Sequence, residues 1–130
     1  MIVVGLQEMV GLGFFKSVGN FFKSKADNEK KRTDKWLKLL PEAMNIACEE
    51  NYIFDQQDQY AFYQGKTMQG CFIGLFTKRK FMSKIKDAYV CKVKAGMGGF
   101  AKNKGSVALR FKVNDSSMAF LNCHLQSGEG

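Results

Sequence analysis

The seven residues VALRFKV, at positions 107–113, decide the fold. Apolar side chains occupy every odd-numbered position of this stretch, and basic side chains stand at two of its three even-numbered positions. A period of two is typical of a half-buried β-strand. The turn-forming residues Asn114-Asp115-Ser116 come next, and the apolar run from Met118 to about Cys123 predicts a further strand. That last strand would deliver His124 at its C-terminal end.

Earlier parts of the chain also have strand patterns. Ile2-Val3-Val4 is a short β-branched run that predicts a buried strand. Three more strands are predicted further along: Tyr60–Tyr63, Cys71–Thr77 and a half-buried strand over residues 88–93. Gly65 and Gly70 are interpreted as turn residues between the first two of these.

One helix is predicted between the first strand and the later ones. Thr33-Asp34 offers an N-cap, and the apolar residues that follow recur on one helical stripe, which we expect to be core: Trp36, Leu39, Leu40, Ala43, Met44 and Ala47. Pro41 lies inside the stripe and predicts a kink or two abutting helices. Strands together with this helix predict an α+β fold in which a sheet is layered with helices.

The stretch before that helix, from Gly11 to Arg32, alternates phenylalanine pairs with lysines. It could form a loop or a basic amphipathic helix at a membrane surface. A solvated insertion over about residues 14–32, with a few buried Phe side chains, is the interpretation that we favour.

Composition limits the class of partner. The 130 residues are enough for one core, and 45% of them are hydrophobic, which is a globular composition. The net charge of +8 favours an anionic partner such as nucleic acid, inositol phosphate or an acidic membrane. A basic surface that merely keeps the protein soluble is the alternative.

The cysteines point to a reducing compartment. Cys48, Cys71, Cys91 and Cys123 form no CxxC pair, and His124 is the single histidine, so a zinc site is not expected. The start of the chain does not resemble a signal peptide, and no apolar run has the length of a membrane span. We therefore expect a cytoplasmic protein with free, buried thiols.

The glycine-rich loop does not predict a nucleotide site. Residues 96–101, GMGGFA, fit a dinucleotide fingerprint, but such a motif must open a helix, whereas the chain from Gly105 onward alternates like a strand. Lys104-Gly105-Ser106 also reverses the residue order that a P-loop requires.

Polar residues stand instead at the ends of predicted strands: Glu8, Asn103, Lys104, Asn122 and His124. Strand ends share a rigid scaffold, which is a common way to build a site. Each residue also has a structural interpretation, as a surface carboxylate, a turn or a satisfied core histidine.

Three motifs favour the functional interpretation of these residues over the structural one. The segments VGLQEMV (4–10), GMGGFAKNKGSV (96–107) and NCHLQSG (122–128) resemble, in order and spacing, segments of the inositol polyphosphate 5-phosphatase family, with its synaptojanin-like catalytic domain. The resemblance covers essentially the whole chain. It implies that residues 1–130 are part of a catalytic domain with the endonuclease/exonuclease/phosphatase fold, a four-layered sandwich of two β-sheets flanked by helices.

The resemblance also implies roles for the strand-end residues. Glu8 would bind Mg²⁺, a hard ion that takes oxygen ligands. His124 would hydrogen-bond the scissile 5-phosphate, more strongly as an imidazolium. Asn103 and Lys104 would contact the phosphate that joins the inositol ring to the lipid. We interpret Asn122 as a structural residue or as one that supports the site residues.

The expected activity is magnesium-dependent hydrolysis of the 5-phosphate of phosphoinositides or inositol polyphosphates. Peripheral contact with an anionic membrane is expected, and nucleic acid is not. Two alternatives stay open: a nuclease of the same fold, and a non-catalytic phosphoinositide-binding module.

The chain also departs from the family pattern. Lys102 replaces a usual Gly and Cys123 a usual Ser, and further family motifs, including the expected water-activating group, are absent. The 130 residues alone are therefore expected to be inactive.

Overall fold

The computed structural model describes residues 1–9, 23–49, 55–68, 70–95 and 104–125. Its strands are β1 (Ile2–Leu6), β2 (Tyr60–Met68), β3 (Cys71–Lys78), β4 (Ile85–Lys94), β5 (Gly105–Val113) and β6 (Ser116–His124). One long helix, α1 (Lys23–Glu49), follows β1, and two short 3₁₀ helices, η1 (Gln56–Asp58) and η2 (Arg79–Lys84), connect later elements.

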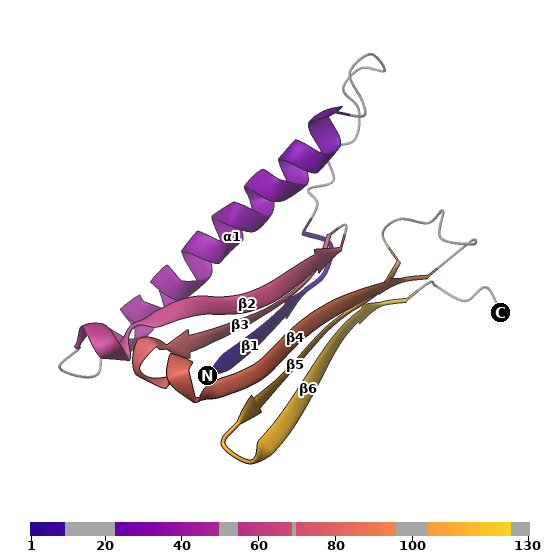
Figure 1. The fold of residues 1–130 in the computed structure, drawn as a ribbon. Coiled ribbons are helices and arrows are strands. Elements are labelled where there is room, and N and C mark those ends of the chain that lie inside the picture. Colours follow the sequence, from indigo (N-terminus) through magenta and orange to yellow (C-terminus); the bar gives the residue numbers. More distant parts are fainter. Residues whose placement is uncertain (10–22, 50–54, 69, 96–103, 126–130) are drawn as a thin grey trace.

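The described elements form three layers. One antiparallel sheet has the strand order β1-β3-β2, and a second has the order β4-β5-β6. The two sheets pack face to face, and α1 lies along the outer face of the first (Figure 1). The predicted α+β class is confirmed, and the described residues supply a helix layer and both sheets of the expected sandwich.

The core lies between the sheets. Val107, Leu109 and Phe111 of β5 are buried there, as the alternation in VALRFKV predicted, while Arg110 between them is exposed. They meet β3, whose residues from Cys71 to Thr77 are all buried. A strand buried on both faces has no polar alternation, which explains the continuous apolar sequence of β3.

The helix corrects two predictions. It begins at Lys23 rather than near Thr33, because residues 23–32 are rich in Lys, with one Arg, one Ala and one Glu, and all four residue types are strong helix formers. It also continues through Pro41 as one element, so the prediction of two abutting helices is wrong. Within the predicted insertion over about 14–32, residues 23–32 are helical and residues 14–22 lie outside the described residues, so the insertion itself stays a prediction.

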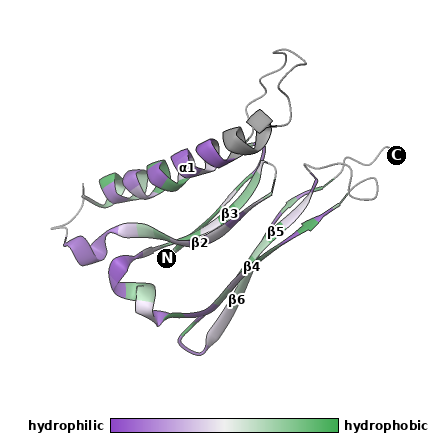
Figure 2. Cartoon of the chain, turned by 45° about the horizontal axis from the view of Figure 1, so that its top comes forward, coloured by the Kyte–Doolittle hydropathy of each residue, from purple (hydrophilic) through white to green (hydrophobic). Residues whose placement is uncertain are grey.

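The apolar stripe of α1 is only partly core. Leu40 and Met44 are half-buried, but Trp36 and Leu39 keep 39% and 42% of their surface exposed. In Figure 1, α1 diverges from the first sheet toward its N-terminus, and hydrophilic and hydrophobic residues alternate along the part of the helix that is coloured in Figure 2.

Gly65 was also predicted wrongly as a turn residue. It lies inside β2, directly opposite Gly74 of β3. A Cβ atom at Gly65 would come within 2.5 Å of the Ile73 carbonyl oxygen, so this close approach of the strands requires a glycine. Gly70, by contrast, has a φ of 86° and does lie in the turn before β3.

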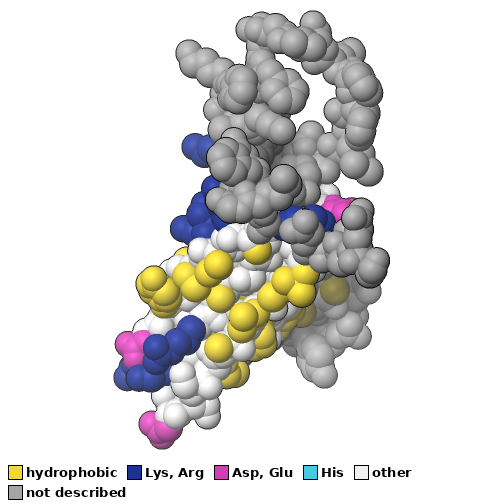
Figure 3. All heavy atoms as spheres, turned by 90° about the vertical axis from the view of Figure 1, so that its right-hand side faces the viewer, with side chains coloured by type: hydrophobic (Ala, Val, Ile, Leu, Met, Phe, Trp, Pro, Cys, Tyr) yellow, Lys and Arg dark blue, Asp and Glu magenta, His cyan; other side chains and the backbone are white. Residues whose placement is uncertain are grey.

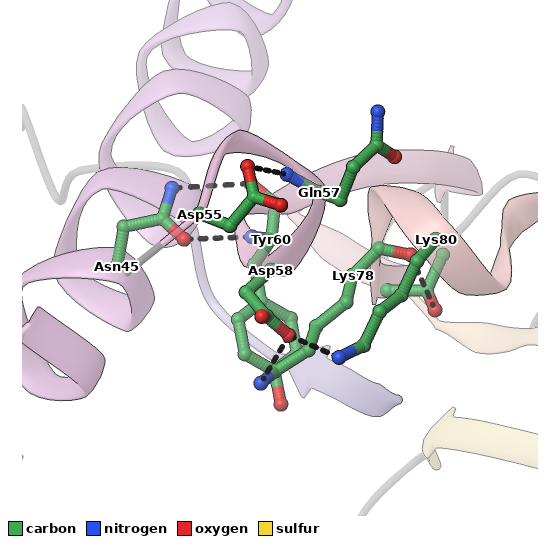
Figure 4. A network of polar contacts seen from close by, with 8 residues as sticks. Asn45, Asp55, Gln57, Asp58, Tyr60, Lys78 and Lys80 are labelled. Carbon is green, nitrogen blue, oxygen red and sulfur yellow. Dashed lines mark hydrogen bonds and ion pairs between the residues drawn. The ribbon is translucent and has the colours of Figure 1, made fainter. Parts of the chain in front are cut away.

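A polar network fixes the C-terminal part of α1 to the first sheet (Figure 4). The Asn45 side chain accepts a hydrogen bond from the Tyr60 amide at 2.7 Å and donates one to the Tyr60 carbonyl at 3.2 Å. Beside it, Asp58 pairs with Lys78 and Lys80, whose hydrogen bonds hold the pKa of that carboxyl below its usual value. The helix is thus anchored where β2 begins.

The thiols are free, as predicted, but only Cys71 is fully buried. Burial, and secondarily the Cys123 thiol, raises the pKa of Cys71. Cys123 itself is exposed, so the expectation that all four thiols are buried is wrong. Within the described ranges, no helix has both the length and the apolar character needed to cross a bilayer.

Replacing Asn45 with leucine should lower the free energy of unfolding. The Tyr60 amide would lose its acceptor while remaining part-buried, which costs about 1–3 kcal/mol. Glu42→Leu, at an exposed position of the same helix, is the matched control. Urea unfolding of both variants measures the difference, and equal stabilities would show that Asn45 does not anchor the helix.

Candidate active site

Three of the five predicted site residues meet at one end of the sandwich. Glu8 is the second residue after β1, Lys104 directly precedes β5, and His124 ends β6. The register pairs Gly105 with His124, so the start of β5 and the end of β6 lie side by side. In Figure 1 this is the end to which β1, β2, β4 and β6 all run.

The side chains are in contact or nearly so. Lys104 Nζ lies 2.9 Å from His124 Nε2. This histidine nitrogen also lies 3.8 Å from Glu8 Oε1. A lysine ammonium can only donate, so a hydrogen bond between these two nitrogens requires His124 Nε2 to be the acceptor. The His124 side chain is only 14% exposed, whereas that of Glu8 is 73% exposed.

The backbone around Gly105 places Lys104. Gly105 has a φ of +142°, and a Cβ atom there would lie 2.1 Å from the Val93 carbonyl oxygen. Only glycine allows this approach. The Ala95 amide also donates to the Lys104 carbonyl at 2.9 Å, which ties the residue to the end of β4.

Glu8 has an unusual backbone conformation. Its φ of 54° lies in the left-handed region, which is unfavourable for a residue with a long side chain. The next amide, that of Met9, donates to the Gly70 carbonyl at 2.9 Å and helps to hold the turn. Strain of this kind persists only where the surroundings impose it, and it is common at functional sites. Here it directs a carboxylate toward His124 and solvent.

Asn122 joins the two sheets behind the site. Its Nδ2 donates to the Leu6 carbonyl at 2.8 Å and to the Phe72 carbonyl at 2.9 Å, on neighbouring strands of the first sheet. A Cβ atom on Gly5 would lie 3.3 Å from the Asn122 side chain, so the glycine leaves room for the amide. The supporting role expected for Asn122 is thus visible in its contacts.

Asn103 lies outside the described residues, so its predicted role stays a prediction. Sequence reasoning did not single out Gln7, whose amide nevertheless reaches β6 from the residue before Glu8. Its adjacency to Glu8 inside the VGLQEMV motif was the available signal.

The metal expectation can be tested against the donors present. Among the residues that the structure describes, no three His, Cys, Asp or Glu side chains gather as a closed metal cage. Magnesium usually takes only one or two protein carboxylates and completes its shell with water and substrate phosphate. The single exposed carboxylate of Glu8, beside two phosphate-binding side-chain types, fits that kind of site.

Comparison with known proteins identifies the family. Residues 1–130 match the model of the family described as "Endonuclease/Exonuclease/phosphatase family 2". The chain belongs to this family.

Relatives within it include inositol polyphosphate 5-phosphatases, as the motifs indicated. The chain is 31% identical over 139 residues to "Probable inositol polyphosphate 5-phosphatase" of Schizosaccharomyces pombe, and 29% identical over 129 residues to human Synaptojanin-2. Each comparison covers 99% of this chain.

A solved structure confirms the fold. The inositol polyphosphate 5-phosphatase domain of SPsynaptojanin, determined with inositol (1,4)-bisphosphate and calcium ion, matches with a TM-score of 0.58 and 24% identity over 97% of this chain. The chain spans 31% of that domain's chain, and 11% and 7% of the two curated relatives.

Glu8→Asn should leave the free energy of unfolding unchanged or raise it by up to about 1 kcal/mol, because asparagine tolerates the left-handed region better than glutamate. Asp115→Asn, in the exposed turn at the opposite end, is the control for loss of one carboxylate. Thermal or urea unfolding provides the measurement. A clear loss of stability in Glu8→Asn alone would mean that the carboxylate supports the fold.

Proposed function

We propose that this protein hydrolyses the 5-phosphate of phosphoinositides or inositol polyphosphates with the help of Mg²⁺, and that these residues form part of its catalytic domain. One observation carries the proposal. Glu8, Lys104 and His124, from three separate segments of the chain, converge at one end of the sandwich, where Lys104 Nζ lies 2.9 Å and Glu8 Oε1 3.8 Å from His124 Nε2.

The two nitrogen-bearing side chains suit a phosphate. The Lys104 ammonium has three hydrogens, so it can bind a phosphate oxygen while remaining next to His124. His124 can donate from Nε2, once that atom carries a proton, to an oxygen of a different phosphate group, the scissile 5-phosphate. Charge-assisted hydrogen bonds to phosphate are short and roughly twice as strong as neutral ones.

Glu8 is the residue that would hold the metal. Magnesium, when bound, would neutralise charge on the phosphoryl group. The carboxylate lies open to solvent and 3.8 Å from the histidine, so a cation there would be next to a scissile phosphate held by His124. The related SPsynaptojanin domain, which was solved with calcium ion and inositol (1,4)-bisphosphate, is consistent with this pairing of cation and ligand.

The outer face of the second sheet supports the proposal that more protein completes the domain. Tyr89 and Val93 of β4 and Leu121 of β6 are 65%, 62% and 67% exposed, and apolar side chains gather on this face (Figure 3). Exposed apolar surface of this kind is usually covered by another element. A further helix layer there would give the four layers that the sequence motifs imply.

Cytoplasmic location and peripheral contact with anionic membranes are part of the proposal. The net charge of +8 supports attraction to such a surface, and the free thiols support a reducing compartment.

The test is phosphate release from a soluble inositol trisphosphate by the full-length protein that carries this sequence. We expect release that stops when Mg²⁺ is chelated. Glu8→Gln should raise the magnesium requirement, and His124→Ala should lower kcat about a hundredfold by removing a charge-stabilising contact. Glu42→Gln, on the exposed face of α1, is the control.

Three results would contradict parts of this proposal. Cleavage of DNA or RNA instead would indicate a nuclease, and phosphoinositide binding without turnover would indicate a non-catalytic module. Phosphate release by the isolated 130 residues would disprove their expected inactivity.

Lys104→Ala should distinguish lipid recognition from general basic charge. If Lys104 contacts the phosphate linking the ring to the lipid, the variant should lose about 1.5–3 kcal/mol of binding to membrane phosphoinositide, and much less with soluble substrates that lack this phosphate. Lys92→Ala, an exposed lysine on β4, should give a small effect that is equal for both substrates and fades with salt. Kinetics with both substrates at two salt concentrations provide the measurement, and equal losses in Lys104→Ala would remove it from the site.

A further inference from the structure

We infer that Gln7 is a positioning residue, which holds Glu8 at the correct distance from His124 by attaching the end of β1 to the end of β6. This inference rests on the proposed function, because it concerns how the proposed site is kept in order. Gln7 Nε2 donates to the Cys123 carbonyl at 2.7 Å and to Asn122 Oδ1 at 3.1 Å. Both hydrogens of the Gln7 amide group are therefore donated to acceptors on one strand, β6.

These hydrogen bonds can position the site because the residues that make them are neighbours of Glu8 and His124 in the sequence. Gln7 directly precedes Glu8, and Cys123 directly precedes His124. The 2.7 Å hydrogen bond from Gln7 to Cys123 therefore connects the two residues that directly precede Glu8 and His124. Among the described residues, the bond from Asn122 to the Leu6 carbonyl also joins these two segments, but it lies one residue further from both side chains.

Gln7 and Asn122 have different tasks. The Asn122 amide donates behind the site, to carbonyls of Leu6 and Phe72, and fixes the two sheets together. Gln7 is exposed and lies at the surface, beyond the last residue of β1. Its bonds restrain the strand end rather than the packed core.

The strained backbone of Glu8 makes such a restraint necessary. With a φ of 54°, Glu8 would relax toward a more favourable conformation if its neighbours allowed it. The residues on both sides of Glu8 are restrained. Met9 follows Glu8, and its amide donates to the Gly70 carbonyl. Gln7 precedes Glu8, and its side chain donates to the Cys123 carbonyl of β6. Magnesium demands near-ideal ligand geometry, and a misplacement of about 1 Å in a site can lower the rate about a hundredfold.

The variant Gln7→Met tests the inference, because it keeps the length of the side chain and removes the amide. In the full-length protein we expect the Kd for Mg²⁺, measured by calorimetry, to rise at least about tenfold, with a similar fall in kcat and little change in KM. Raising the magnesium concentration should recover much of the kcat of Gln7→Met. It should recover much less of the kcat of Glu8→Gln, which lacks the carboxylate.

Gln57→Met, at an exposed position of η1, is the matched control for the same chemical change. Gln57→Met should leave magnesium affinity, kcat and the urea midpoint unchanged. The urea midpoint of Gln7→Met should be close to that of Gln57→Met.

Two outcomes would overturn the inference: a magnesium affinity of Gln7→Met equal to that of Gln57→Met, or a loss of affinity that simply follows a loss of stability. If the parental protein binds magnesium but releases no phosphate, the proposed function fails, whereas calorimetry still decides whether Gln7 positions Glu8.

Discussion

The side-chain amide of Asn122 connects the two sheets at the end of the molecule where the candidate site lies. Apolar contacts between β3 and β5 hold the sheets together, but such contacts are non-directional and leave the sheets free to shift by small amounts. Hydrogen bonds from Asn122 to Leu6 and Phe72 have a defined geometry and remove that freedom. At the opposite end Tyr63 Oη donates to the Ile85 carbonyl at 3.4 Å, so the sandwich is joined at both ends.

The geometry of the site follows from this connection. Lys104 and His124 belong to the second sheet, and the pairing of Gly105 with His124 fixes their separation within that sheet. Glu8 belongs to the first sheet, so its distance of 3.8 Å from His124 depends on how the sheets sit on one another. One contact is therefore set by strand register and the other by the junction between sheets.

The strands and the strand-end residues could be predicted from sequence because both are local signals. The alternation in residues 107–113 reports which side chains face the core, and Glu8 and His124 stand beside those strands in the sequence. The start of α1 was missed because a good cap residue at Thr33 says nothing about whether upstream residues also favour a helix. Gly65 was misread because the close approach of β3 that requires it is a tertiary contact.

The contacts that order the site could not be predicted from the sequence, because they too are tertiary contacts between distant segments. Gln7 and Cys123 are 116 positions apart, and nothing in either neighbourhood indicates that an amide from one reaches the carbonyl of the other. The strain at Glu8 is likewise invisible in the sequence, since glutamate has no preference for a positive φ. A residue held against its preference needs restraint from outside its own segment. Gln7, which supplies part of this restraint, is an uncharged amide of the kind that chemical reasoning about metals and phosphates passes over.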